Sequence, residues 1–219
     1  MPKMARLVVP GYPHHVTQRG SRRQTTFFGE PDYKTYVNLL ASHRVAAGVE
    51  VWAYCLMPNH VHLVLVPREA DSLARLLRDT HSTYARHVNA IQGWCGHLWQ
   101  ERFHSVVMDE AHLLAAVRYV ELNPVRASLC RQATDWPWSS ARAHLLKHPD
   151  NLMPKAPMLD RIDDWQAYLS RENSKSIDAR LRRLTSSGRP AGSDEFIRNL
   201  EALTGRTLAR QKPGPKTRN

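Results

Sequence analysis

The chain has 219 residues, 42% of them hydrophobic, which is enough for one domain with a sizeable core and an appendage. Its formal net charge of +11 indicates a polyanionic partner, and 24 of its 31 basic residues are Arg, whose planar guanidinium suits bidentate contacts with phosphate. Three scattered cysteines exclude a disulfide framework. The first residues lack a signal-peptide core, and no run approaches the roughly 18 apolar residues of a membrane span. We expect a soluble cytoplasmic protein with no membrane partner.

The first third of the chain predicts strands around one helix. Residues 6–18 read as an extended segment that continues into an Arg-rich loop. Residues 31–47 have apolar side chains near helical spacing and predict a helix. Residues 49–56 and 60–66 are rich in β-branched and aromatic side chains, which favours strands. The short link between these two strands predicts an antiparallel hairpin.

The middle of the chain predicts two more helices with a strand between them. Residues 71–91 read as a long amphipathic helix, residues 103–108 as a short strand and residues 109–122 as a helix that Pro124 ends. The order β–α–β–β–α–β–α predicts an α+β fold, an antiparallel sheet with helices on one face, close to a ferredoxin-like unit.

The character of the sequence changes after the middle. We expect a main domain over residues 1–145 and a small helical, basic C-terminal extension over residues 146–219, with a short helix at 160–169. From residue 161 onward there are 13 Lys and Arg against 7 Asp and Glu. Residues 210–219 read as a disordered tail, which either adds nonspecific phosphate affinity or only solubilises the chain.

Two histidines open the second strand of the hairpin. His60 and His62 are two residues apart, so a strand places both on one face, about 7 Å apart along the chain. They are either ordinary polar residues at a strand end or a pair that shares a metal ion. Two neutral imidazoles suit several divalent metals, and a third ligand is needed to choose among them.

The helix at 109–122 carries a second candidate pair. Tyr119 and Asn123 are four residues apart and share a helical face, from which a phenol and an amide could approach the histidines. Taken singly, Tyr119 is a packing residue and Asn123 a helix cap. Tyr84 is a competing tyrosine, for which we expect a packing role. Trp99 and Arg102 read either as a pair that stacks on a base and contacts phosphate, or as core and rim.

Five stretches together resemble a known family. PHHVTQRGSRRQ, YCLMPNHVHLVLVP, GHLWQERFHS, RYVELNPVRASL and DWPWSS occur in the order seen in single-tyrosine HUH transposases, and most resemble the group associated with repetitive extragenic palindromes (REP). The resemblance covers roughly residues 5–145. It implies a ferredoxin-like HUH endonuclease domain in which His60 and His62 hold Mg²⁺ or Mn²⁺, Asn123 completes the metal site and Tyr119 is the nucleophile.

The resemblance also implies an activity. It predicts a metal-dependent endonuclease and strand-transferase that nicks single-stranded DNA beside hairpins through a 5′-phosphotyrosine, acting at the nucleoid as a monomer or homodimer. Water on the metal and His112 are both candidates for the general base. The residues expected to contact DNA are Arg19, Arg22, Arg23, Trp99, Arg102 and Arg118.

Two other functions stay open at this point. The first is a hairpin-specific DNA-binding protein that no longer cleaves, which would have no need to keep His60, His62 and Tyr119 together. The second is an unrelated metal hydrolase that combines the histidine pair with a carboxylate, for which Glu110 and Glu121 are the candidates.

Overall fold

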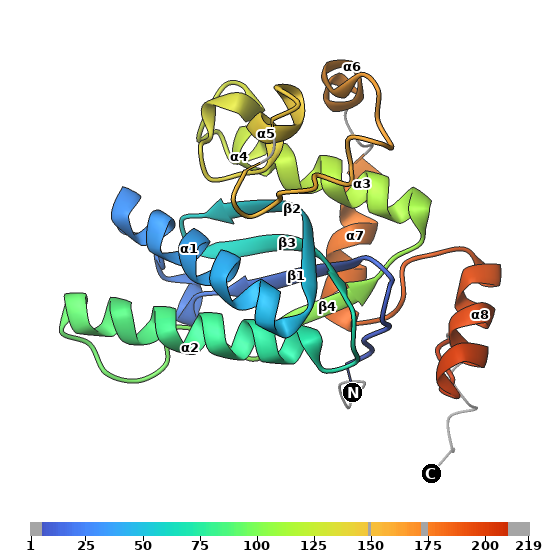
Figure 1. The fold of residues 1–219 in the computed structure, drawn as a ribbon, viewed down its shortest axis with the longest axis horizontal. Helices are drawn as coiled ribbons and strands as arrows, with labels where there is room; N and C mark the ends of the chain where they lie inside the picture. Colours follow the sequence, from blue (N-terminus) through green and yellow to red (C-terminus); the bar gives the residue numbers. More distant parts are fainter. Residues whose placement is uncertain (1–5, 149, 172–174, 210–219) are drawn as a thin grey trace, which may run out of the picture.

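A four-stranded antiparallel sheet forms the centre of the molecule (Figure 1). The computed structural model describes residues 6–148, 150–171 and 175–209. The strands lie in the order β2-β3-β1-β4 and are β1 (His14–Arg19), β2 (Val49–Met57), β3 (His60–Pro67) and β4 (His104–Val107). The helices α1 (Glu30–Ala47) and α2 (Ser72–Gln92) alternate with them along the chain as β1-α1-β2-β3-α2-β4. This order confirms the predicted ferredoxin-like α+β fold.

One face of the sheet packs against α1 and α2. Residues of β2 and β3 at alternate positions, with Val16 of β1, point to this face and form one apolar core with both helices. Val61, between the two histidines, is fully buried in this core, to which Leu76 and Leu77 of α2 also belong. His60 and His62 therefore point to the opposite face of the sheet, as the period of a strand requires.

The opposite face is also covered, so the prediction of helices on one face only was wrong. A second apolar core joins the sheet to α3 (Glu110–Glu121), α6 (Trp165–Ser170) and α7 (Lys175–Ser187). β2 is buried along almost its whole length, and β3 is buried from Val61 to its end. Near-continuous apolar runs of this kind are typical of strands buried on both faces.

The C-terminal part of the chain shares the cores of the main fold. The backbone at Ala191 pairs with Met108 in a parallel bridge beside β4. Helix α8 (Asp194–Thr204) then covers a small apolar cluster in which Leu200 meets Leu7 and Val9. The packing of the described residues shows no break at residue 145, the predicted boundary between the main domain and the C-terminal extension. The tail predicted at 210–219 lies outside the described residues.

The remaining helical segments are short. They are η1 (Ser21–Arg23), α4 (Asn123–Arg126), η2 (Ala133–Asp135) and α5 (Ala141–Leu145). Of all helices in the described part of the chain, none combines the length and apolar character that crossing a membrane requires.

Candidate active site

A cleft of about 460 Å³ opens on the α3 and α7 face of the sheet. Its lining comes from β1, β3, α3, α7 and the segment before β4. Among the described residues that line it, four are arginines and one is a glutamate: Arg19, Arg23, Arg102, Arg182 and Glu101. The cleft therefore has the charge expected of a site for a phosphate backbone.

His60 and His62 lie in this cleft with their ring centroids 4.9 Å apart. Each ring is held through its Nδ1 atom. His60 Nδ1 is 2.6 Å from Asn59 Oδ1, and His62 Nδ1 is 3.0 Å from His15 Nε2. These contacts leave both Nε2 atoms for a ligand.

Burial keeps both histidines neutral. Burial, with the nearby Arg19 cation as a second cause, lowers the pKa of His60 to about 4. The pKa of His62 is well below its usual range because the ring is buried, and the neighbouring His60, His15 and arginines lower it further. A neutral imidazole is the form that binds a metal, so the pair fits a divalent cation at neutral pH.

His15 connects the histidine pair to α7. Its ring stacks on His62 with centroids 5.2 Å apart, and its Nδ1 is 3.1 Å from the Thr185 hydroxyl. Thr17 pairs with His62 across the strands, which makes His15 the diagonal neighbour of His62 on the same face. We did not single out His15 or Thr185 from the sequence. The alternation of HHVT in a strand could have predicted that His15 shares a face with the histidine pair. No pattern in the sequence predicts the position of Thr185.

Tyr119 lies beside the histidines near the end of α3. Its ring meets His62 edge-on with centroids 5.6 Å apart, and only 6% of the residue is exposed. The guanidinium of Arg126 lies 4.2 Å from the centre of the phenol ring. Arg182 Nε donates a hydrogen bond of 3.2 Å to the phenol oxygen. The arrangement presents a tyrosine oxygen and two imidazoles to one cleft.

The start of α3 explains why His112 is not in the cleft. Asp109 caps the helix by accepting from the backbone N–H of His112, and the same oxygen is 2.7 Å from His112 Nδ1. His112 is seven residues before Tyr119, about 10 Å along the helix axis. It is absent from the described lining of the cleft.

Asn123 begins α4, directly after the tyrosine helix. It is not among the described lining residues of the cleft, and its amide Nδ2 is buried without a hydrogen-bond partner in the described structure. Rotation of this amide exchanges its nitrogen for its oxygen, which is the atom a cation requires. Among the described residues, no group of three or more His, Cys, Asp or Glu could hold a metal. A third ligand from Asn123 stays a prediction.

The arginines of the first loop divide between two environments. Arg19 and Arg23 line the cleft, as does Arg102. Arg22 lies in η1 with a left-handed backbone at φ 54° and is not part of the described lining.

Two of the expected DNA contacts lie elsewhere. Trp99 packs against the α1 and α2 core, and its Nε1 donates 3.1 Å to the carbonyl of His81. Arg118 donates 2.9 Å to the carbonyl of Tyr168 and lies over that ring, on the side of α3 that faces α6. The geometry therefore divides the pair: Trp99 packs against the core, whereas Arg102 lines the cleft and stays a predicted phosphate contact.

Tyr84, the competing tyrosine, is fully buried in the α1 and α2 core. Its hydroxyl donates a hydrogen bond of 2.7 Å to the carbonyl of Thr26. This placement agrees with the packing role predicted for it.

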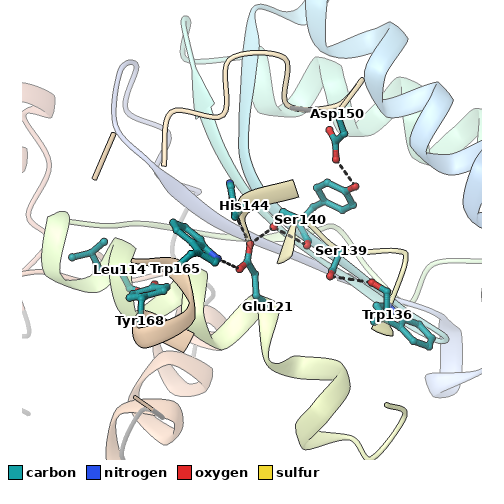
Figure 2. Close-up of polar contacts among 10 residues, drawn as sticks. Leu114, Glu121, Trp136, Ser139, Ser140, His144, Asp150, Trp165 and Tyr168 are labelled. Atoms are coloured by element: carbon teal, nitrogen blue, oxygen red, sulfur yellow. Dashed lines mark hydrogen bonds and ion pairs between the residues drawn. The ribbon is translucent and has the colours of Figure 1, made fainter. Parts of the chain in front are cut away.

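The hydrolase carboxylates do not reach the histidines. Glu110 pairs with Arg161 at the surface, with a separation of 3.2 Å. Glu121 is fully buried and accepts hydrogen bonds from Ser140, His144 and Trp165 (Figure 2). Neither lines the cleft, so the metal-hydrolase hypothesis was wrong. Instead, side chains at the start of α5, within α5 and in α6 donate the hydrogen bonds that Glu121 accepts.

A histidine pair on a central strand of a ferredoxin-like sheet, facing a tyrosine near the end of a helix, defines the single-tyrosine HUH class of protein. The comparisons with known proteins agree. The model of the family described as "Transposase IS200 like" matches residues 9–123, just over half of the chain, and the chain belongs to this family.

Two similar proteins carry a more specific name. A Haemophilus influenzae protein assigned as a REP-associated tyrosine transposase is 26% identical over 102 residues, covering 42% of this chain and 58% of that relative. The chain thus spans less than two thirds of that relative's length. The solved structure of a REP-associated tyrosine transposase bound to a REP hairpin matches with a TM-score of 0.58 and 19% identity, covering 67% of this chain and 87% of that one. At this identity the match shows a shared fold.

Proposed function

We propose that this protein is a transposase that nicks and rejoins single-stranded DNA at hairpin-flanked sites through a 5′-phosphotyrosine intermediate. The observation that carries the proposal is the phenol of Tyr119 beside His62 in a cleft rich in arginine. The membership of the IS200-like transposase family supports it independently.

The reaction is a transesterification at phosphorus. A bond forms between Tyr119 Oη and the scissile phosphorus, the bond from phosphorus to the 3′ oxygen breaks, and the phenolic proton ends on that 3′ oxygen. The free 3′-OH and the tyrosyl ester together keep the energy of the phosphodiester bond. Rejoining to the same or another 3′-OH therefore needs no ATP.

His60 and His62 would hold the metal, with Asn123 as the predicted third ligand. Mg²⁺ or Mn²⁺ bound there would stabilise the charge that develops on the phosphoryl oxygens, and Mn²⁺ suits imidazole ligands better. The chain itself contributes neutral, oriented imidazoles, because burial and the Nδ1 contacts fix both rings before a cation arrives.

The basic lining of the cleft supports a DNA partner. Arg19, Arg23 and Arg102 line the cleft with Tyr119, and we propose that they contact phosphates of the bound strand. A hairpin as the recognised element is supported by the similar protein of known structure, which is bound to a REP hairpin. We propose that the protein acts at the nucleoid, as a monomer or homodimer.

The proposal is tested by incubating the protein with a labelled single-stranded hairpin oligonucleotide and Mg²⁺ or Mn²⁺. We expect a covalent protein–DNA adduct that survives denaturing electrophoresis. Tyr119→Phe should abolish the adduct and leave DNA binding within about threefold, because the lost hydroxyl does not contribute to the basic lining.

Tyr84→Phe is the matched control, since it removes the same hydroxyl from a buried tyrosine outside the cleft. It should retain the adduct. Binding of the hairpin without an adduct in the wild-type protein would favour the alternative of a hairpin-specific DNA-binding protein. An adduct that persists in Tyr119→Phe would contradict the assignment of the nucleophile.

A further inference from the structure

Helix α7 lies outside the residues that match the family model, yet it reaches the phenol of Tyr119. We propose that Arg182 of α7 is a catalytic residue that stabilises the negative charge on the Tyr119 oxygen, both when the phenol attacks and when it leaves. This inference rests on the proposed function and extends the active site into the C-terminal part of the chain.

The two arginines at Tyr119 have different positions. Arg126 lies over the phenol ring at 4.2 Å from its centroid, and it also donates to the backbone carbonyl of Tyr119. Arg182 lies farther from the ring centroid, at 5.8 Å, while its Nε is 3.2 Å from the phenol oxygen. Arg126 thus packs against the ring, whereas Arg182 is directed at the reacting atom.

Other contacts along α7 fix the position of Arg182. The preceding residue, Leu181, is buried in the core that α3 shares with the sheet. One turn on, the Thr185 hydroxyl is 3.1 Å from His15 Nδ1. One turn before, Asp178 lies 3.7 Å from Arg126. Three contacts that do not involve Arg182 therefore hold α7 beside the site.

A cation beside this oxygen favours the proposed chemistry. A phenol that attacks phosphorus must lose its proton, and a guanidinium keeps its charge at any pH at which the protein is folded. A charge-assisted hydrogen bond from Arg182 favours the oxygen when it carries negative charge. In the rejoining step the phosphorus–Oη bond breaks, and the incoming 3′-OH supplies the proton that restores the phenol. The same hydrogen bond then stabilises the leaving oxygen.

The contact with Tyr119 also affects the protonation of Arg182. The hydrogen bond and the charge interaction with Tyr119 raise the pKa of Arg182 above its already high usual value. Arg182 lines the same cleft as His60 and His62, so a phosphate held there would have both the proposed metal ligands and this guanidinium in the lining around it.

The test is the rate of adduct formation in single turnover, measured from pH 6 to 9.5 with the hairpin oligonucleotide and Mn²⁺. Three variants are compared with the wild-type protein: Arg182→Gln, Arg182→Lys and Arg180→Gln. Arg180 is exposed on the same helix, outside the described lining of the cleft, so its replacement removes the same charge from α7. Thermal unfolding and DNA affinity are recorded for each.

We expect Arg182→Gln to slow adduct formation roughly 10- to 100-fold and to displace the rate–pH profile to higher pH, with DNA affinity changed less than about threefold. Arg182→Lys should recover part of the rate, and Arg180→Gln should match the wild type. A merely structural role would lower the melting temperature without moving the pH profile.

Two results would overturn the inference while the proposed function stands. One is a wild-type rate and pH profile in Arg182→Gln. The other is faster adduct formation in that variant, which would make Arg182 a restraint on the phenol. Absence of any adduct in the wild-type protein would instead refute the proposed function and the inference with it.

Discussion

At the scale of single residues, His15 holds one nitrogen of His62 and leaves the other for the proposed cation. The contact of 3.0 Å between His15 Nε2 and His62 Nδ1 occupies one nitrogen of the proposed ligand and turns the other into the cleft. A ligating histidine is commonly held through its second nitrogen in this way. The Thr185 hydroxyl holds His15 in turn, so the orientation of the proposed metal ligand His62 depends on α7.

Replacing His15 should therefore weaken metal binding. We expect His15→Phe, which keeps a ring and loses the hydrogen bonds, to lower Mn²⁺ affinity about 10- to 100-fold in isothermal titration calorimetry. His104→Gln is the control, because His104 lines the same cleft but pairs with Glu101. It should change the affinity less than about twofold. Unchanged affinity in His15→Phe would show that His62 is oriented without it.

Buried histidines away from the cleft make the stability depend on pH. Burial lowers the pKa of His14 to about 4 and that of His81 to about 3, against 6.5 in an unfolded chain. Above pH 6.5 both states hold neutral imidazoles. As the pH falls from 6.5 towards 4, the unfolded chain binds protons that the folded protein does not, so the free energy of unfolding decreases.

We expect a loss of about 1 kcal/mol per pH unit for each such histidine between pH 6.5 and 4. Urea unfolding at pH 7 and pH 5 measures it, and His81→Asn should make the dependence shallower. Equal or greater stability at pH 5 would mean that these rings are protonated in the folded protein.

The signals that predicted His60, His62 and Tyr119 are local. A period of two in a strand places the histidine pair on one face, and short motifs around each residue resemble one family. Arg182 and Thr185 carry no such signal, since they reach the site only because α7 packs across the sheet. Trp99 was ambiguous for the same reason: an aromatic residue in a loop stacks on a base or fills a core, and only the packing distinguishes the two.

At the scale of elements, the end of α3 is held by a buried carboxylate. Glu121 follows Tyr119 by two residues and accepts from Ser140 at 2.5 Å, His144 at 2.6 Å and Trp165 at 2.9 Å (Figure 2). These donors come from the start and the body of α5 and from α6. The network joins α3 to segments that follow it in the chain and so fixes the position of Tyr119.

Glu121→Ala should destabilise the protein by about 3–5 kcal/mol, since it leaves three buried donors without their acceptor. Urea unfolding at neutral pH measures the change. Glu110→Ala removes a carboxylate from the exposed end of the same helix and should cost about 0–1 kcal/mol. Similar losses in the two variants would mean that the network around Glu121 contributes nothing beyond a surface ion pair.

The covering of the two faces of the sheet is the part of the fold that we predicted wrongly from the sequence. The order of strands and helices predicted a ferredoxin-like unit, and the helices that complete it, α1 and α2, cover one face. The second cover comes from α3, α6 and α7. The signal was present in the near-continuous apolar run of VEVWAYCLM, because a strand with one wet face alternates apolar and polar residues.

At the scale of the whole molecule, the C-terminal part of the chain contributes to the lining of the cleft and to the cores. Composition distinguished it as basic and helical, which led us to treat it as an extension. Composition does not report tertiary contacts, and here the buried Trp165 and Leu181 tie this part to α3 and the sheet. Part of the positive charge behind the net value of +11 lies on the arginines that line the cleft beside Tyr119.

The most direct test of the proposed function is to identify the residue that carries the DNA. The covalent adduct, trimmed with nuclease and digested with trypsin, would be analysed by mass spectrometry. We predict one modified peptide, carrying a nucleotide joined through its 5′-phosphate to Tyr119. A nucleotide on any other residue, or hairpin DNA cleaved with no protein-linked product, would contradict the account.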